Sequence, residues 1–151
     1  MRLRPAAFFG LTLVRLLLTD PANGDPTQTG SVVIATVGKL RAPRGNIGCR
    51  LFFQEKSFPR GTERTVRKSV HVSGDFARCV FENVPPGTYA MTVIHDENDN
   101  GKLDKNFIGM PTEGYGVSNN KTHATSAPVW SECKFVVEAS KKRQLAIGLR
   151  Y

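Results

Sequence analysis

Apolar and polar side chains alternate in several short runs along the chain, with the two-residue period of a β-strand that buries one face. The runs are rich in Val, Ile and Phe, and no stretch shows a comparable helical period. They cover residues 31–37, 47–53, 66–72, 76–82, 88–95, 132–138 and 144–151. The pattern therefore predicts an all-β chain of about seven strands.

Turn-forming residues separate these runs, with Pro-Arg-Gly at 43–45 and 59–61, Gly-Asp at 74–75 and Pro-Pro-Gly at 85–87. Strands that bury one face need a second sheet to cover them. The sequence thus predicts an antiparallel β-sandwich, either immunoglobulin-like or transthyretin-like. A closed barrel is the alternative arrangement.

One connection, residues 96–131, is much longer than the others and shows no clean strand or helix pattern. Loops of this length in compact domains are usually functional or disordered. This one contains apolar residues that a solvated linker lacks, namely Leu103, Phe107, Ile108, Met110, Tyr115, Val117 and Trp130. We therefore expect one long ordered loop, packed over one end of the sandwich.

The first 24 residues have the organisation of an export signal. Arg2 and Arg4 form a basic start, an apolar run covers residues 6–18, and Ala22-Asn23-Gly24 offers small residues for cleavage. The run is too short, and with Arg15 too charged, for a membrane-spanning helix. We expect a signal peptide at 1–24 and one β-sandwich domain at 25–151, exported (periplasmic or secreted), with no transmembrane helix in the mature chain. An N-terminal helix or a misplaced start codon is the alternative.

Length and charge narrow the class of protein further. The chain has 151 residues, of which 40% are hydrophobic, enough for one self-supporting core. Its formal net charge is +8, and the expected signal holds three Arg and one Asp, so the mature chain carries +6. Residues 96–104 contain four acidic residues and one Lys, a local charge of −3 against +9 elsewhere. This acidic stretch is therefore more informative than the total charge.

The three cysteines, Cys49, Cys79 and Cys133, match no zinc-binding spacing. Each lies on the apolar side of a strand-like run, as expected for a small buried hydrophobic residue. In an exported protein one pair can form a disulfide and leave one thiol. The sequence does not say which pair.

Residues 96–104 read Asp-Glu-Asn-Asp-Asn-Gly-Lys-Leu-Asp, which is the beginning of a calcium-binding loop. In such a loop the oxygens at positions one, three, five, seven and nine surround the cation, and glycine at position six permits a sharp turn. The metal candidates are therefore Asp96, Asn98, Asn100, Lys102 (by its backbone carbonyl) and Asp104. Position twelve is Phe107 instead of Glu, so the site must borrow Glu113 or stay weak, near a Kd of about 0.1–1 mM. A run of tight Asx turns without metal is the equal alternative.

Three segments carry a resemblance to a known family: PPGTYA at 85–90, HDENDNGKLD at 95–104 and GMPTEGYGVSNN at 109–120. Together they resemble the bacterial domain-of-unknown-function family 2141, over roughly residues 30–151. The resemblance implies a small exported bacterial domain with no established activity and no assigned catalytic residues. The Pro-Pro-Gly-Thr-Tyr turn is also similar to transthyretin-like and carboxypeptidase-regulatory-like sandwiches, which supports the fold only.

Catalysis and polyanion binding are the competing functions. His95 beside Asp96 is the best candidate for a hydrolase-like site, but neighbours on a strand point to opposite faces. His95 can instead orient the Asp-rich loop. Basic clusters lie at 60–68 and 141–143 without a nucleic-acid recognition motif. Outside the cytoplasm, lipid headgroups or cell-surface polymers are the expected polyanions, and nucleic acid is not.

We therefore expect an exported, non-catalytic binding or structural module with an Asx-rich loop that either holds calcium or forms a rigid cluster of turns. Its ligand or protein partner is extracytoplasmic and not identified by the sequence. The residues expected to meet it are His95, Glu113, Tyr115, Ser118 and Asn119.

Overall fold

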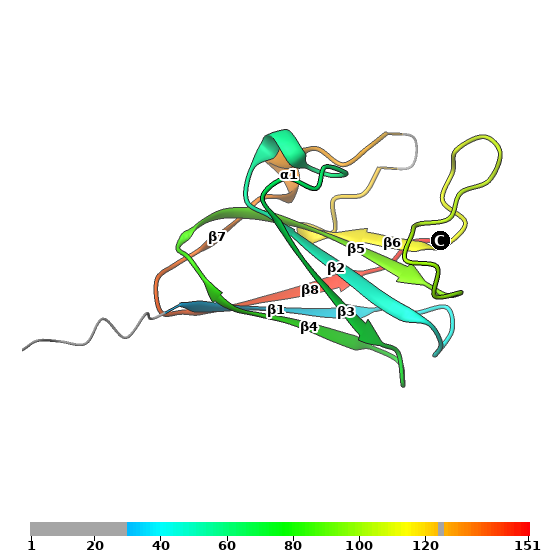
Figure 1. Ribbon diagram of the computed structural model, residues 1–151, viewed down its shortest axis with the longest axis horizontal. Helices are drawn as coiled ribbons and strands as arrows, with labels where there is room; N and C mark the ends of the chain where they lie inside the picture. The colour runs from blue at the N-terminus through cyan, green and yellow to red at the C-terminus, as the bar shows by residue number, and fades with distance from the viewer. Residues whose placement is uncertain (1–29, 124–125) are drawn as a thin grey trace, which may run out of the picture.

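The computed structural model describes residues 30–123 and 126–151, and the expected signal peptide at 1–24 lies outside the described residues. The chain forms two facing β-sheets (Figure 1). The smaller sheet has the order β4-β1-β8, formed by Ala77–Val84, Ser31–Gly38 and Lys142–Gly148. The larger sheet has the order β3-β2-β5-β6, formed by Thr65–His71, Asn46–Phe52, Gly87–Asp96 and Gly114–Val117, with β7 (Phe135–Val137) paired to β5. The mostly-β, sandwich-like fold is thus confirmed.

One strand pair departs from the antiparallel prediction. β1 pairs antiparallel with β4 but parallel with β8, from Val32 opposite Lys142 to Gly38 opposite Gly148. Every other pair of named strands is antiparallel. Parallel pairing here requires the chain to cross from the larger sheet back to β1. Local alternation of side chains carries no information about such a crossover.

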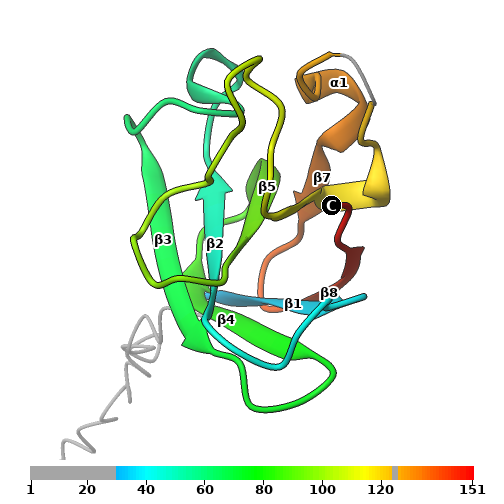
Figure 2. The same ribbon diagram turned by 90° about the vertical axis from the view of Figure 1, so that its right-hand side faces the viewer.

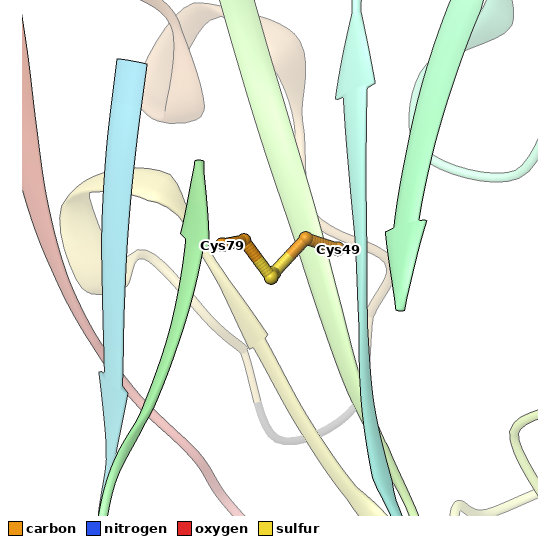
Figure 3. Close-up of a disulfide and its surroundings, with 2 residues drawn as sticks. All are labelled: Cys49 and Cys79. Atoms are coloured by element: carbon orange, nitrogen blue, oxygen red, sulfur yellow. A yellow bond between two sulfur atoms is a disulfide. The ribbon is translucent and has the colours of Figure 1, made fainter. Parts of the chain in front are cut away.

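Alternate side chains from both sheets fill the core between them. In β1 the inward residues Val33, Ala35 and Val37 are fully buried, and the intervening residues are partly exposed. A disulfide joins Cys49 on β2 to Cys79 on β4 and so links the two sheets through this core (Figure 3). Cys133 is the free, buried cysteine. The pairing that the sequence left open is therefore settled.

At the edge of the sandwich, η2 (Ser118–Asn120) follows β6 and bonds through Asn120 to the backbone of Ala146 and Gly148 in β8. Two other short helical segments, η1 (Glu55–Ser57) and α1 (Trp130–Cys133), lie on the outer side of the larger sheet (Figures 1 and 2). They cover part of that face with a second apolar cluster, made of Ala90, Val117 and Cys133 with Phe58 and Trp130 packed against it. The Phe58 ring lies edge-on to the rings of Phe52 and Trp130. Among the residues described, no helix is both long and apolar enough to cross a membrane.

The stretch expected to be one loop, residues 96–131, contains a strand that the sequence pattern missed. In β6, Gly114–Val117, glycine alternates with larger residues. The two-residue alternation of apolar and polar side chains that marks the other strands is therefore absent here. The glycines permit close packing: a Cβ on Gly114 would lie 2.6 Å from the Tyr151 ring. The run expected as a strand from 132 begins instead as α1, and β7 starts only at Phe135. Cys133 is buried as expected, but it ends a helical turn.

Candidate functional site

The Asp-rich segment 96–104 folds into a closed network of hydrogen bonds. The buried Asp96 carboxylate accepts bonds from the backbone N–H groups of Asn100 at 3.0 Å and Gly101 at 2.7 Å. The Asp104 carboxylate accepts bonds from the side-chain amides of Asn98 at 2.8 Å and Asn100 at 2.9 Å. The four side chains with carboxylate or amide oxygens at the expected metal positions are therefore brought together.

Glu113 holds the two ends of this segment. It is 5% exposed, and its two carboxylate oxygens accept hydrogen bonds from the backbone N–H groups of Glu97 at 2.9 Å and Asp104 at 3.0 Å. Glu113, which the sequence suggested as a substitute calcium ligand, thus has both carboxylate oxygens bonded to backbone N–H groups. In the described part of the chain, no group of three or more His, Cys, Asp and Glu side chains has an arrangement that holds a metal ion.

Two arginines from the turn between β1 and β2 balance part of the loop's negative charge. Glu97 lies 2.5 Å from the Arg41 guanidinium and 3.4 Å from that of Arg44. Asn46 donates a side-chain hydrogen bond to Asp99 at 2.5 Å. These contacts fix the Asp-rich segment to the end of the sandwich where β2 begins and β5 ends.

His95 is fully buried and hydrogen-bonded through both ring nitrogens. Its Nε2 lies 2.8 Å from the Arg44 carbonyl oxygen, and its Nδ1 lies 2.7 Å from the Tyr151 hydroxyl. A carbonyl only accepts, so Nε2 carries the proton and Nδ1 accepts from Tyr151. The Tyr151 hydroxyl also accepts the backbone N–H of Arg41 at 2.8 Å. His95 therefore positions the arginine-bearing turn.

A groove of about 490 Å³ lies on the outer face of the larger sheet, between the β5–β6 loop and the segment that follows η1. Its floor comes from β2, β3, β5 and β6 and includes Gly48, Ile94 and Tyr115. Five cationic side chains line it: Arg50, Arg60, Arg67, Lys102 and Lys105. None of the described residues that line it is acidic. Five of the chain's basic residues thus share one concave surface.

Two of these cations lie directly opposite each other on the groove floor. Arg50 on β2 pairs in register with Arg67 on β3, and like charges in this position repel. Burial, and then the charge of Arg67, lower the pKa of Arg50. Arg50 is held in place by the carbonyl oxygens of Arg60 at 3.2 Å and Gly61 at 3.1 Å. A bound anion would offset this repulsion.

A smaller hollow of about 320 Å³ continues the groove toward the Asp-rich segment. It shares Gly48, Arg67, Ile94 and Gly101 with the groove and extends to Asp96. The closed Asx network and the cationic groove are therefore adjacent.

The sequence profile of one bacterial family, described as an uncharacterized protein conserved in bacteria (DUF2141), matches residues 35–145. This chain belongs to domain-of-unknown-function family 2141. No curated protein and no solved structure shows a significant match. The family is bacterial, and the Cys49–Cys79 disulfide is typical of an oxidising, extracytoplasmic location.

In this family 2141 domain, the residues expected to meet a ligand lie apart. Tyr115 lines the groove, whereas His95 faces the interior and Glu113 ties the loop. The Ser118 hydroxyl is buried, where it accepts from the Met91 N–H and donates to the Cys133 carbonyl. Asn119 donates to the carbonyl oxygens of Glu132 and Lys134, each at 3.0 Å. These side chains fix the fold around the groove.

The sequence shows the basic cluster that contains Arg60 and Arg67. It does not show that Arg50 and Lys105 belong to the same site. The available signal was Arg50 itself, a charged residue between the apolar Cys49 and Leu51 in a strand-like run. Such a position faces away from the core. That the β5–β6 loop folds over the same face could not be inferred from the run.

Proposed function

We propose that this exported family 2141 domain is a non-catalytic binding module whose cationic groove holds an anionic ligand. The observation that supports this most directly is the Arg50–Arg67 pair on the groove floor, without an acidic partner among the described lining residues. A cross-strand pair of like charges destabilises a sheet. A bound phosphate, sulfate or carboxylate group would convert this cost into a favourable interaction.

The groove favours an anion that also carries an apolar part. Its volume of about 490 Å³ lies within the range of small-molecule sites. Ile94, Met110 and Tyr115 contribute apolar surface beside the cations. A polymeric polyanion would also meet the cations, but it would leave this apolar surface unused. We assign no catalytic role to His95, because it is fully buried and both of its ring nitrogens are engaged.

Phenyl phosphate, which combines a phosphate with an aromatic ring, is a suitable probe. We expect it to raise the unfolding midpoint of the domain, because a ligand that binds only the native state stabilises it. Benzyl alcohol, which lacks the charge, is expected to have no effect. Arg67→Gln should weaken binding about tenfold or more, whereas Arg78→Gln, an exposed arginine on β4, should not. Equal binding by the two variants would contradict the proposal.

We also propose that calcium reinforces the Asp-rich loop. The supporting observation is that Asp96, Asn98, Asn100 and Asp104 share one hydrogen-bond network, in which their side-chain oxygens accept from the Asn100 backbone N–H and from the asparagine NH2 groups. Oxygen atoms of this kind are the ligands that calcium prefers. The cation would take the place of the two asparagine amides at the Asp104 carboxylate, and we expect a weak Kd, near about 0.1–1 mM.

Thermal unfolding in millimolar calcium, in magnesium and in chelator tests this second proposal. Calcium should raise the midpoint of the wild-type domain and of Asp75→Asn, which removes an exposed carboxylate from the β3–β4 turn. It should not raise the midpoint of Asp104→Asn. Identical midpoints in calcium and chelator would exclude a calcium site in this loop and would leave the groove proposal unaffected.

A further inference from the structure

The β5–β6 loop carries a cluster of apolar side chains in solvent. We name residues Asn106–Met110 the apolar tip. Phe107 is 99% exposed, Ile108 68% and Met110 44%. Figures 1 and 2 show that this yellow-green loop extends away from the sheets, on the side where η1 and α1 lie. Clusters of exposed apolar groups mark interaction sites more often than isolated ones do.

The backbone of the apolar tip satisfies much of its own hydrogen bonding. Asn106 exchanges bonds with the turn: its N–H donates to the Met110 carbonyl, and its own carbonyl accepts the Gly109 N–H, each at 2.9 Å. Its side-chain oxygen accepts the N–H groups of Ile108 at 3.1 Å and Met110 at 3.0 Å. A backbone that is bonded internally loses less on entering an apolar medium. The tip is therefore a preformed turn that presents Phe107 and Ile108.

Cations surround the base of the apolar tip. Lys102 and Lys105 lie in the same loop and line the groove, as do Gly109 and Met110 of the tip itself. The same loop holds the four acids of segment 96–104, and each is engaged within the domain: Asp96 by backbone N–H groups, Glu97 by Arg41 and Arg44, Asp99 by Asn46, and Asp104 by Asn98 and Asn100. One side of the tip is thus the wall of the cationic groove. A surface bound by the tip would meet the groove cations at the same time.

We propose that the apolar tip docks this domain on a membrane surface that carries anionic lipid headgroups. Phe107 and Ile108 enter the boundary between headgroups and acyl chains, and a headgroup phosphate enters the groove, a step that rests on the proposed anion-binding function. Stable attachment to a bilayer surface requires two signals together, and apolar insertion combined with basic residues is such a pair. A protein partner is the competing occupant, and the experiment separates the two.

Co-sedimentation with vesicles tests the inference. The mature domain should bind vesicles of equimolar phosphatidylcholine and phosphatidylglycerol, but bind phosphatidylcholine vesicles weakly or not at all. The double variant Phe107→Ser, Ile108→Ser should reduce binding to the anionic vesicles at least about tenfold. Phe76→Ser is the matched control, because Phe76 is 58% exposed in the β3–β4 turn, away from the tip, and it should bind like the wild type.

A second readout measures insertion directly. A tryptophan placed by Phe107→Trp should shift its emission to shorter wavelength when anionic vesicles are added, and one placed by Phe76→Trp should not. Vesicle binding that is unaffected by the double variant, or no shift for Phe107→Trp, would overturn the inference. No vesicle binding by the wild type would overturn it as well and would favour a protein partner.

Failure of this inference is distinguishable from failure of the proposed function. If the double variant binds phenyl phosphate like the wild type but loses the vesicles, both the groove and the tip are supported. If the wild type binds phenyl phosphate and not vesicles, the groove proposal stands and the docking inference falls. If it binds neither, both fall.

Discussion

Among single residues, the exposed Tyr151 completes a polar network around the buried His95. Its hydroxyl is shared between His95 and the backbone N–H of Arg41, and the Arg41 guanidinium lies 4.5 Å from the centre of its ring. Because the buried His95 depends on this hydroxyl, one exposed aromatic residue fixes the turn that anchors the Asp-rich loop. These hydrogen bonds have a structural role. They affect the site by holding the β1–β2 turn, and with it the Asp-rich loop, in place.

Tyr151→Phe should destabilise the domain by about 1–3 kcal/mol, because it leaves Nδ1 of the buried His95 without its donor. The ring and its contact with Arg41 are retained. Urea unfolding measures the loss. Tyr115→Phe is the control, since that hydroxyl makes only a 3.3 Å bond to the His123 carbonyl and its removal should cost less. Equal losses would show that His95 does not depend on Tyr151.

The same hydroxyl gives a pH dependence with a definite sign. Burial, with a smaller contribution from Glu97, raises the pKa of Tyr151 above its ordinary value of 10.0, against the opposing effect of Arg41. The folded state thus favours the protonated form. Its contribution is complete below pH 10 and is lost as the pH rises through the folded pKa. The stability difference between wild type and Tyr151→Phe should therefore shrink above about pH 10, and a constant difference would contradict this assignment.

Cys133 should be chemically inert in the folded domain. Burial, and then the charge of Glu132, raise the pKa of Cys133 to about 11. The reactive thiolate is therefore scarce at neutral pH, and the sulfur is inaccessible. Mass spectrometry after iodoacetamide treatment should show no label on the native protein and one label after denaturation without reduction. Rapid labelling of the native protein would contradict the burial of Cys133.

At the scale of elements, β2 and β3 show how a stable sheet accommodates a binding surface. β2 buries Ile47, Cys49 and Leu51 on one face and presents Arg50 on the other, opposite Arg67 of β3. The apolar face supplies the stability that allows the repulsive pair on the groove face. Cations on an edge strand such as β3 also oppose pairing with other chains.

Arg67→Gln should stabilise the free domain by about 0.2–1 kcal/mol, because it removes the repulsion from Arg50. The same change should weaken phenyl phosphate binding. Chemical unfolding without ligand, measured beside Arg78→Gln, tests the stability part. A loss of stability in Arg67→Gln would show that the pair is not repulsive in the free protein.

At the scale of the whole molecule, a disulfide and the crossings of the chain tie the two sheets together. The disulfide crosses the core from β2 to β4, and the long connection from β5 returns through β6 and β7 to β8 of the smaller sheet. Acidic and basic side chains are also separated over the whole molecule. The acidic segment lies against arginines of the β1–β2 turn, while five cations gather in the neighbouring groove.

Replacing both disulfide cysteines, Cys49→Ala with Cys79→Ala, should lower the free energy of unfolding by at least about 3–4 kcal/mol. The bond closes a loop with a sequence separation of 30, and its loss restores the freedom of the unfolded chain. Urea unfolding with and without reductant gives an independent measure in the wild type. A wild-type midpoint that does not change on reduction would contradict this role of the disulfide.

Most strand positions, and the face of each strand that is buried, follow from the order of apolar and polar residues along the chain. The run at 47–53 corresponds to β2 at Asn46–Phe52, and the run at 88–95 to β5 at Gly87–Asp96. The sequence also indicated the clustering of the Asx side chains. These features are local, because alternation along a strand and turns within a short segment depend on near neighbours in the chain.

Strand pairing, the choice of bonded cysteines and the position of the groove depend instead on contacts between distant parts of the chain. The parallel contact of β1 with β8 joins segments that are far apart in the sequence, and so does the bond between Cys49 and Cys79. Arg50 and Lys105 share one groove only because the β5–β6 loop folds back over the sheet. Side-chain periodicity records whether a residue faces the core. It does not record what approaches the other face.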